Sequence, residues 1–259
     1  MSLQELSFIE PITEPDILAD IATLPTADEL PCDDGEPMET GRHREQMKLL
    51  IQSLQAYWSE RTDYFVAGNM FLHYDPQNRR KSRGPDFFLV LDVSNHERKS
   101  WVVWQEGMRF PDVIIELLSD TTRDINKGEK KVLYERVFRT AEYYLYDPFS
   151  QEFIGYHLRG AHYQEVQPDE QGRVYSPVTG LYLVPRSNWL RWLTPEGQVL
   201  PSPIELAEQQ RQRAEQERQR AEQAKQHAAQ ADQRAEQAEQ RAKHAEQRAD
   251  QAEQLLEKY

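Results

Sequence analysis

The chain has 259 residues, a formal net charge of -13 and 38% hydrophobic residues, so it can bury a substantial core. Its single cysteine excludes an intramolecular disulfide and a zinc site built on cysteines, which is typical of a reducing compartment. No signal peptide begins the chain and no segment has the ~20 apolar residues that span a bilayer, so we expect a cytoplasmic protein without membrane contact.

The first predicted elements are an acidic, proline-rich leader over residues 1–40 and an amphipathic helix over residues 42–60. The helix is indicated by apolar residues at spacings of three and four, namely Met47, Leu50, Ile51, Leu54 and Trp58. Arg44, Glu45 and Lys48 fall on its polar face. A domain of residues 41–203 is expected to begin with this helix.

Runs rich in β-branched and aromatic residues follow, and they predict strands. These runs cover residues 64–74, 87–93, 101–104 and 113–118. The last is apolar on both faces except at Glu116, as expected in the middle of a sheet. A helix over 124–137, capped by Asp124, a strand over 142–146 and a meander over 152–158, 161–166 and 181–184 complete a mixed α/β plan.

The tail, residues 204–259, predicts one long helix with alanine at a period of seven. One row runs from Ala207 to Ala249 and a second from Ala224 to Ala252. Rows three or four residues apart are typical of a coiled coil, although alanine buries only about a third of the apolar area of leucine. Self-association, a solitary helix supported by pairs such as Glu239 with Lys243, and a partner-binding helix are the three alternatives.

Three charged residues could meet in a chemical site. Asp86 opens a strand after Pro85, Glu116 interrupts an apolar strand, and Lys130 lies on the following helix. If the strands are neighbours, their carboxylates could share Mg²⁺ or Mn²⁺, which prefer oxygen ligands and promote phosphodiester hydrolysis. Taken singly, Asp86 could cap a turn, Glu116 could pair with a buried arginine and Lys130 could face solvent.

The ordered set resembles the Uma-type restriction endonuclease family of the PD-(D/E)XK nuclease superfamily. The resemblance covers residues 40–185 and is carried by Gly84-Pro85-Asp86, by residues 110–119 (FPDVIIELLS), by Asp124, Gly128-Glu129-Lys130 and Tyr134, and by residues 141–148 (AEYYLYDP). It implies a restriction-endonuclease-like core, a mixed sheet flanked by helices, with Asp86 and Glu116 as metal ligands.

The chain departs from the superfamily at the usual lysine position, two residues after the glutamate, which here is Leu118. Lys130 matches the lysine of the family's own pattern, with Lys127 and Lys131 as fallback choices. By analogy with first-helix acids in related nucleases, Glu45 is a further candidate for the site.

The leading hypothesis is a Mg²⁺-dependent or Mn²⁺-dependent DNA endonuclease that forms a homo-oligomer through its C-terminal helix. The alternative is a catalytically silent scaffold that uses the nuclease fold and the long helix for protein interaction. The acidic charge favours the scaffold, whereas a basic run at residues 79–83 offers a local surface for DNA.

Overall fold

The computed structural model describes residues 21, 23–31, 40–119 and 121–256. Contacts divide the chain into two units, residues 1–203 and 204–259. In its described part, the first unit holds one six-stranded sheet and two three-stranded sheets. The strands are β1 (Tyr64–Ala67), β2 (Leu72–His73), β3 (Ser82–Arg83), β4 (Phe87–Leu91), β5 (Trp101–Val102), β6 (Val113–Leu117), β7 (Glu142–Tyr146), β8 (Phe153–Arg159), β9 (His162–Val166), β10 (Val174–Ser176), β11 (Leu181–Arg186) and β12 (Trp189–Leu193).

The six-stranded sheet has the order β1-β4-β6-β7-β8-β9. β6 and β7 are parallel, and the other neighbours are antiparallel. All residues of β6 are buried, so the prediction of a strand in the middle of a sheet is confirmed. The mixed sheet and its helices confirm the predicted mixed α/β class.

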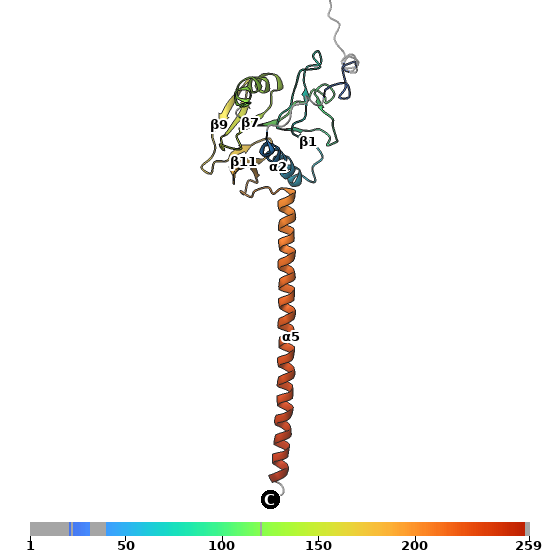
Figure 1. Ribbon diagram of the computed structural model, residues 1–259, viewed down its shortest axis with the longest axis vertical. Helices are drawn as coiled ribbons and strands as arrows, with labels where there is room; N and C mark the ends of the chain where they lie inside the picture. The colour runs from blue at the N-terminus through green and yellow to red at the C-terminus, as the bar shows by residue number, and fades with distance from the viewer. Residues whose placement is uncertain (1–20, 22, 32–39, 120, 257–259) are drawn as a thin grey trace, which may run out of the picture. The chain divides into compact units, whose positions relative to one another are not determined.

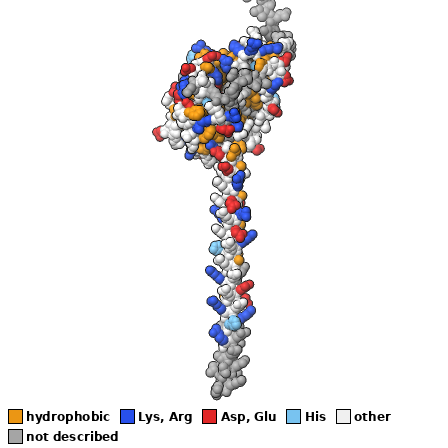
Figure 2. All heavy atoms as spheres, in the orientation of Figure 1, with side chains coloured by type: hydrophobic (Ala, Val, Ile, Leu, Met, Phe, Trp, Pro, Cys, Tyr) orange, Lys and Arg blue, Asp and Glu red, His pale blue; other side chains and the backbone are white. Residues whose placement is uncertain are grey.

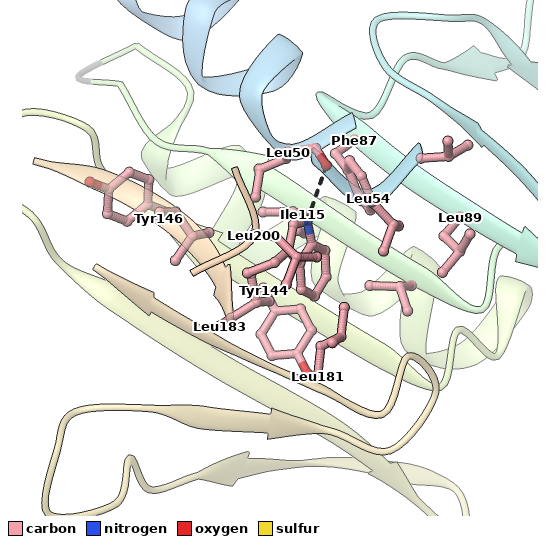
Figure 3. Close-up of a cluster of buried hydrophobic side chains, with 14 of the residues drawn as sticks. Leu50, Leu54, Phe87, Leu89, Ile115, Tyr144, Tyr146, Leu181, Leu183 and Leu200 are labelled. Carbon is pink, nitrogen blue, oxygen red and sulfur yellow. Dashed lines mark hydrogen bonds between the residues drawn. The ribbon is translucent and has the colours of Figure 1, made fainter. Parts of the chain in front are cut away.

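One face of this sheet packs against the helix α2 (Gly41–Tyr57) and the β10-β11-β12 sheet. Figure 3 shows Leu50 and Leu54 of α2 meeting Phe87, Ile115 and Tyr144 of the central strands. The indole of Trp192 donates a hydrogen bond to the carbonyl of Leu50 at 3.1 Å. The apolar stripe predicted for this helix therefore lies on its buried side.

The opposite face is covered by the crossover between β6 and β7 (Figure 1). This crossover segment consists of α3 (Arg123–Ile125), η1 (Asn126–Lys130), α4 (Lys131–Leu133) and η2 (Tyr134–Phe138), of which η1 and η2 are π-helical. The prediction that Asp124 caps it is wrong, because Thr122 holds the capping position and Asp124 lies in the first turn. A carboxylate in the first turn still faces the positive end of the helix dipole.

Part of the predicted leader packs on the domain. Leu24, Ala27 and Leu30 contact Val102 and Trp104, and the Trp104 indole donates to the carbonyl of Pro25 at 2.9 Å. Residues 1–20, 22 and 32–39, on which the rest of this prediction falls, lie outside the described residues. The boundary between leader and domain at residue 40 stays a prediction.

A buried carboxylate joins the central sheet to the β10-β11-β12 sheet. Glu142 accepts hydrogen bonds from the Ser176 hydroxyl at 2.5 Å, the Tyr144 hydroxyl at 3.0 Å and the Val178 amide at 2.8 Å. Burial raises the pKa of Glu142 to about 7, and the hydrogen bonds oppose this rise. The meander prediction did not include β10 and β12, which complete the small sheet.

The second unit is the helix α5 (Pro203–Leu256), so the predicted long helix is confirmed. From Ala207 onward every side chain whose burial is described is exposed, and charged side chains of both signs line the helix in Figure 2. The predicted pair of Glu239 and Lys243 is formed at 3.0 Å. Within the described residues, no helix is both long and apolar enough to cross a membrane.

Candidate active site

Asp86 and Glu116 are cross-strand neighbours. β4 and β6 pair antiparallel with Phe87 opposite Ile115, so one step further along the ladder Asp86 lies opposite Glu116. Asp86 lies two residues before Phe88, and Glu116 lies two residues after Ile114. Residues two apart in a strand share one face, so both acids point to the face that the crossover segment covers. The Leu117 amide donates a hydrogen bond to Oδ2 of Asp86 at 2.7 Å, which fixes this carboxylate at the end of β6.

The crossover segment supplies partners for both carboxylate oxygens of Glu116, whose side chain is 1% exposed. Lys130 Nζ lies 3.0 Å from Oε2, and the Tyr134 hydroxyl donates to Oε1 at 2.8 Å. Residues four apart share one face of a helix, and π-helical turns occur frequently at functional sites. The structure therefore brings together Asp86, Glu116 and Lys130, as predicted, and adds Tyr134.

Burial and mutual charge alter the acidity of these groups. Burial, followed by the neighbouring Glu116 carboxylate, raises the pKa of Asp86 well above its ordinary value, and Lys130 opposes this. Burial lowers the pKa of Lys130, but Glu116 and Asp86 together outweigh it and leave this pKa raised. Burial and Glu116 raise the pKa of Tyr134 well above its usual range. The site therefore holds two close acids, one ammonium ion and one neutral phenol.

The two fallback lysines have other partners. Lys127 Nζ lies 2.7 Å from Oε1 of Glu152, and Lys131 Nζ lies 4.2 Å from the ring centroid of Tyr156. Glu45 is also engaged elsewhere, because its carboxylate is 60% exposed and pairs with Lys48 at 3.1 Å. The structure does not place Glu45 with the Asp86–Glu116 pair, and its role stays a prediction.

Three residues that support the site were not among the predicted site residues. Tyr134 could have been found from its spacing of four from Lys130. Arg83 forms an ion pair with Glu129, the neighbour of Lys130. Gly68 lies against the backbone of Asp86, since a Cβ built at Gly68 would stand 2.2 Å from the Asp86 carbonyl oxygen. No local pattern reveals that contact, because it joins two distant segments.

The donor set fits Mg²⁺ or Mn²⁺. Protein sites for Mg²⁺ use one or two carboxylates and leave the remaining positions to water and substrate phosphates. Asp86 and Glu116 are such a pair, and a divalent cation beside them would relieve the repulsion that contributes to the raised pKa of Asp86. In the described ranges, no group of three or more His, Cys, Asp or Glu side chains is arranged to hold a metal ion, so the fit rests on these two residues.

Comparisons with known proteins place the chain in a family. A solved structure from Anabaena variabilis, titled a "putative nuclease belonging to DUF820", is similar at 17% identity and a TM-score of 0.43; the match covers 60% of this chain and 90% of that one. No curated protein matches. The model of the Uma2 family, described as "Putative restriction endonuclease", matches residues 29–185, a range that contains Asp86, Glu116 and Lys130. Because this match spans more than half of the chain, the protein belongs to the Uma2 family.

Proposed function

We propose that this protein is a divalent-metal-dependent endonuclease that hydrolyses phosphodiester bonds of DNA. The observation that supports this most strongly is the pairing of half-buried Asp86 with buried Glu116 on neighbouring strands, with Lys130 donating a hydrogen bond to Glu116. An enclosed acid pair with one ammonium ion is costly to build, and such clusters are enriched at functional sites. Family membership favours the same activity.

The roles of the residues follow from their contacts. Asp86 and Glu116 would hold Mg²⁺ or Mn²⁺, which when bound supplies Lewis-acid stabilisation of a phosphate oxygen and a more acidic water. Lys130 contributes a positive charge beside the carboxylates, where negative charge develops on the phosphate during hydrolysis. Tyr134 and the Leu117 amide orient Glu116 and Asp86 respectively.

We expect wild-type protein to nick plasmid DNA when Mg²⁺ or Mn²⁺ is present, and Asp86→Asn and Glu116→Gln to reduce the rate at least ~100-fold. These isosteric changes keep the shape of the site and remove one negative charge each. Binding of Mn²⁺, followed by electron paramagnetic resonance without DNA, should weaken in both variants. Asp92→Asn, at a carboxylate that is 78% exposed, is the matched control and should change neither property.

Equal nicking by wild type and both site variants would exclude this site as the source of the activity. Wild-type protein that neither binds Mn²⁺ nor nicks DNA would favour the alternative, a nuclease fold used as a scaffold for protein interaction.

We further propose that α5 joins two copies of the chain. Its alanine rows form a narrow seam, and Arg234 lies five residues before Glu239, the offset at which flanking charges pair between parallel coiled-coil helices. Analytical ultracentrifugation at high micromolar concentration should give a dimer or larger species for the full chain and a monomer for residues 1–203. Ala238→Glu, in the seam, should weaken the association, and Gln240→Glu, outside it, should not. A monomeric full chain would refute the proposal.

A further inference from the structure

Two arginines stand at the tip of a hairpin whose second strand ends three residues before Asp86. β2 and β3 pair antiparallel, and the turn between them carries Arg79 and Arg80, both exposed. We call residues 72–83 the hairpin arm. Among the described residues neither arginine forms an ion pair, whereas the cations nearer the carboxylates are paired: Arg83 with Glu129, Lys127 with Glu152 and Lys130 with Glu116.

Both ends of the hairpin arm contact the crossover segment through side chains. At the start, the Tyr74 ring meets the Phe138 ring edge-on at 5.0 Å, and Phe138 lies 5.2 Å from the ring of Tyr134. At the end, Arg83 forms an ion pair with Glu129; burial and, more weakly, the charge of Arg83 act to lower the pKa of Lys130, against the effect of the two carboxylates. Arg83 is followed directly by Gly84, Pro85 and Asp86. The arm is therefore held in place relative to the acid pair.

The tip has a defined backbone conformation. The Asp75 side chain accepts from the Gln77 amide at 3.1 Å, and the Asn78 side chain accepts from the Arg80 amide at 3.2 Å. Backbone hydrogen bonds from Asn78 to Asp75 and from Lys81 to Asn78 close two successive turns. A loop ordered in this way loses less conformational entropy when its side chains bind a ligand.

Charge argues for an anionic ligand. The chain carries a net charge of -13, so a polyanion that approaches it is repelled unless a local cluster of cations receives it. The carboxylate of Glu29 interacts only weakly with Arg79. Its pKa is lowered chiefly by hydrogen bonds from Thr26 and least by the charge of Arg79. Arginine matches phosphate oxygens through two parallel N–H groups, and such contacts set position without reading bases.

We propose that Arg79 and Arg80 of the hairpin arm bind the phosphate backbone of duplex DNA next to the bond that the site cleaves. The inference rests on the proposed function and adds the surface that positions the substrate. In this proposal, the hairpin arm contributes to the affinity for duplex DNA, and this contribution depends neither on base sequence nor on the metal.

The test is binding of a short fluorescent DNA duplex, followed by anisotropy in metal-free buffer over a range of salt concentrations. A plot of log K for DNA binding against log salt has a negative slope, and each lost phosphate contact reduces its magnitude by about 0.9. Arg79→Gln/Arg80→Gln should therefore reduce the magnitude by about 2. Arg211→Gln/Arg213→Gln on α5 removes the same charge from two exposed positions and should leave the slope unchanged. Equal thermal midpoints would confirm that all three proteins are folded.

An unchanged slope in the arm variant, an equal fall in the α5 control, or no duplex binding by wild type would each overturn the inference. These outcomes differ from a failure of the proposed function. If the arm variant reduces the salt dependence of DNA binding but DNA is never nicked, the proposed role of the arm is upheld and the endonuclease proposal fails. If nicking depends on Asp86 while the arm variant keeps its slope, the endonuclease proposal stands and the arm does not bind DNA.

Discussion

Replacing Lys130 with methionine is expected to reduce DNA nicking by about 10²–10³-fold, because the positive charge beside the phosphate is lost. The same change leaves the carboxylate of Glu116 buried and without a cation, with the Tyr134 hydroxyl still donating to it. Removing one partner of a buried ion pair costs about 3–5 kcal/mol, so the free energy of unfolding should fall by about this amount. Plasmid nicking and urea denaturation measure the two effects.

A second variant separates catalysis from folding. Lys130→Met/Glu116→Gln removes both charges together, so most of the lost stability should return while nicking stays at least as slow as in Lys130→Met. Lys131→Met is the matched control, because its ammonium group lies over Tyr156 rather than beside Glu116. If Lys131→Met reduced nicking as much as Lys130→Met, the assignment of the lysine would be wrong.

Gly68→Ala is expected to destabilise the protein by about 1–3 kcal/mol and to slow nicking more than its effect on folding explains. The new methyl group would stand 2.2 Å from the Asp86 carbonyl oxygen and 2.7 Å from two side-chain atoms of Met47. The Met47 side chain can rotate away, but the Asp86 backbone can move only by shifting its carboxylate relative to Glu116. Chemical denaturation gives the first effect, and nicking measured well below the unfolding midpoint gives the second.

Gly84→Ala is the control for this prediction. It places the same methyl group two residues from Asp86, where the nearest atom, on the Phe71 ring, lies at an ordinary 3.7 Å. We expect near-wild-type nicking. Full activity in Gly68→Ala would show that the position of Asp86 does not depend on this contact.

The parts of the site that follow from sequence are those encoded by short, ordered patterns. An acid inside an apolar strand identified Glu116, and the family pattern selected Lys130 over Lys127 and Lys131, which agrees with the ion pair at 3.0 Å. The strands around Asp86 and Glu116 were predicted from β-branched residues, and their alternation sets the shared face.

The remaining features depend on contacts between distant segments, which one sequence does not encode locally. The proximity of Gly68 to Asp86 arises from the pairing of β1 with β4, and the packing of Leu24 and Leu30 on Trp104 arises from the path of the N-terminal segment. Glu45 was selected by analogy alone. In the structure it lies on the exposed face of α2 and forms a salt bridge with Lys48. Short strands such as β10 are three residues long, too short for alternation to be recognised.

The parallel pairing of β6 with β7 has a consequence for the order in which the chain folds. The contact of Lys130 with Glu116 closes a sequence separation of 14 residues within the crossover unit, whereas the contact of Asp86 with Leu117 closes 31. Closing the longer loop costs more entropy, and non-local strand pairing is slow. Glu116 and Lys130 can therefore meet inside one local unit, whereas Asp86 reaches Glu116 only through the pairing of β4 with β6. The acid pair thus depends on this strand pairing, so we expect any opening that separates β4 from β6 to keep the Glu116–Lys130 contact and to divide the two proposed metal-binding carboxylates.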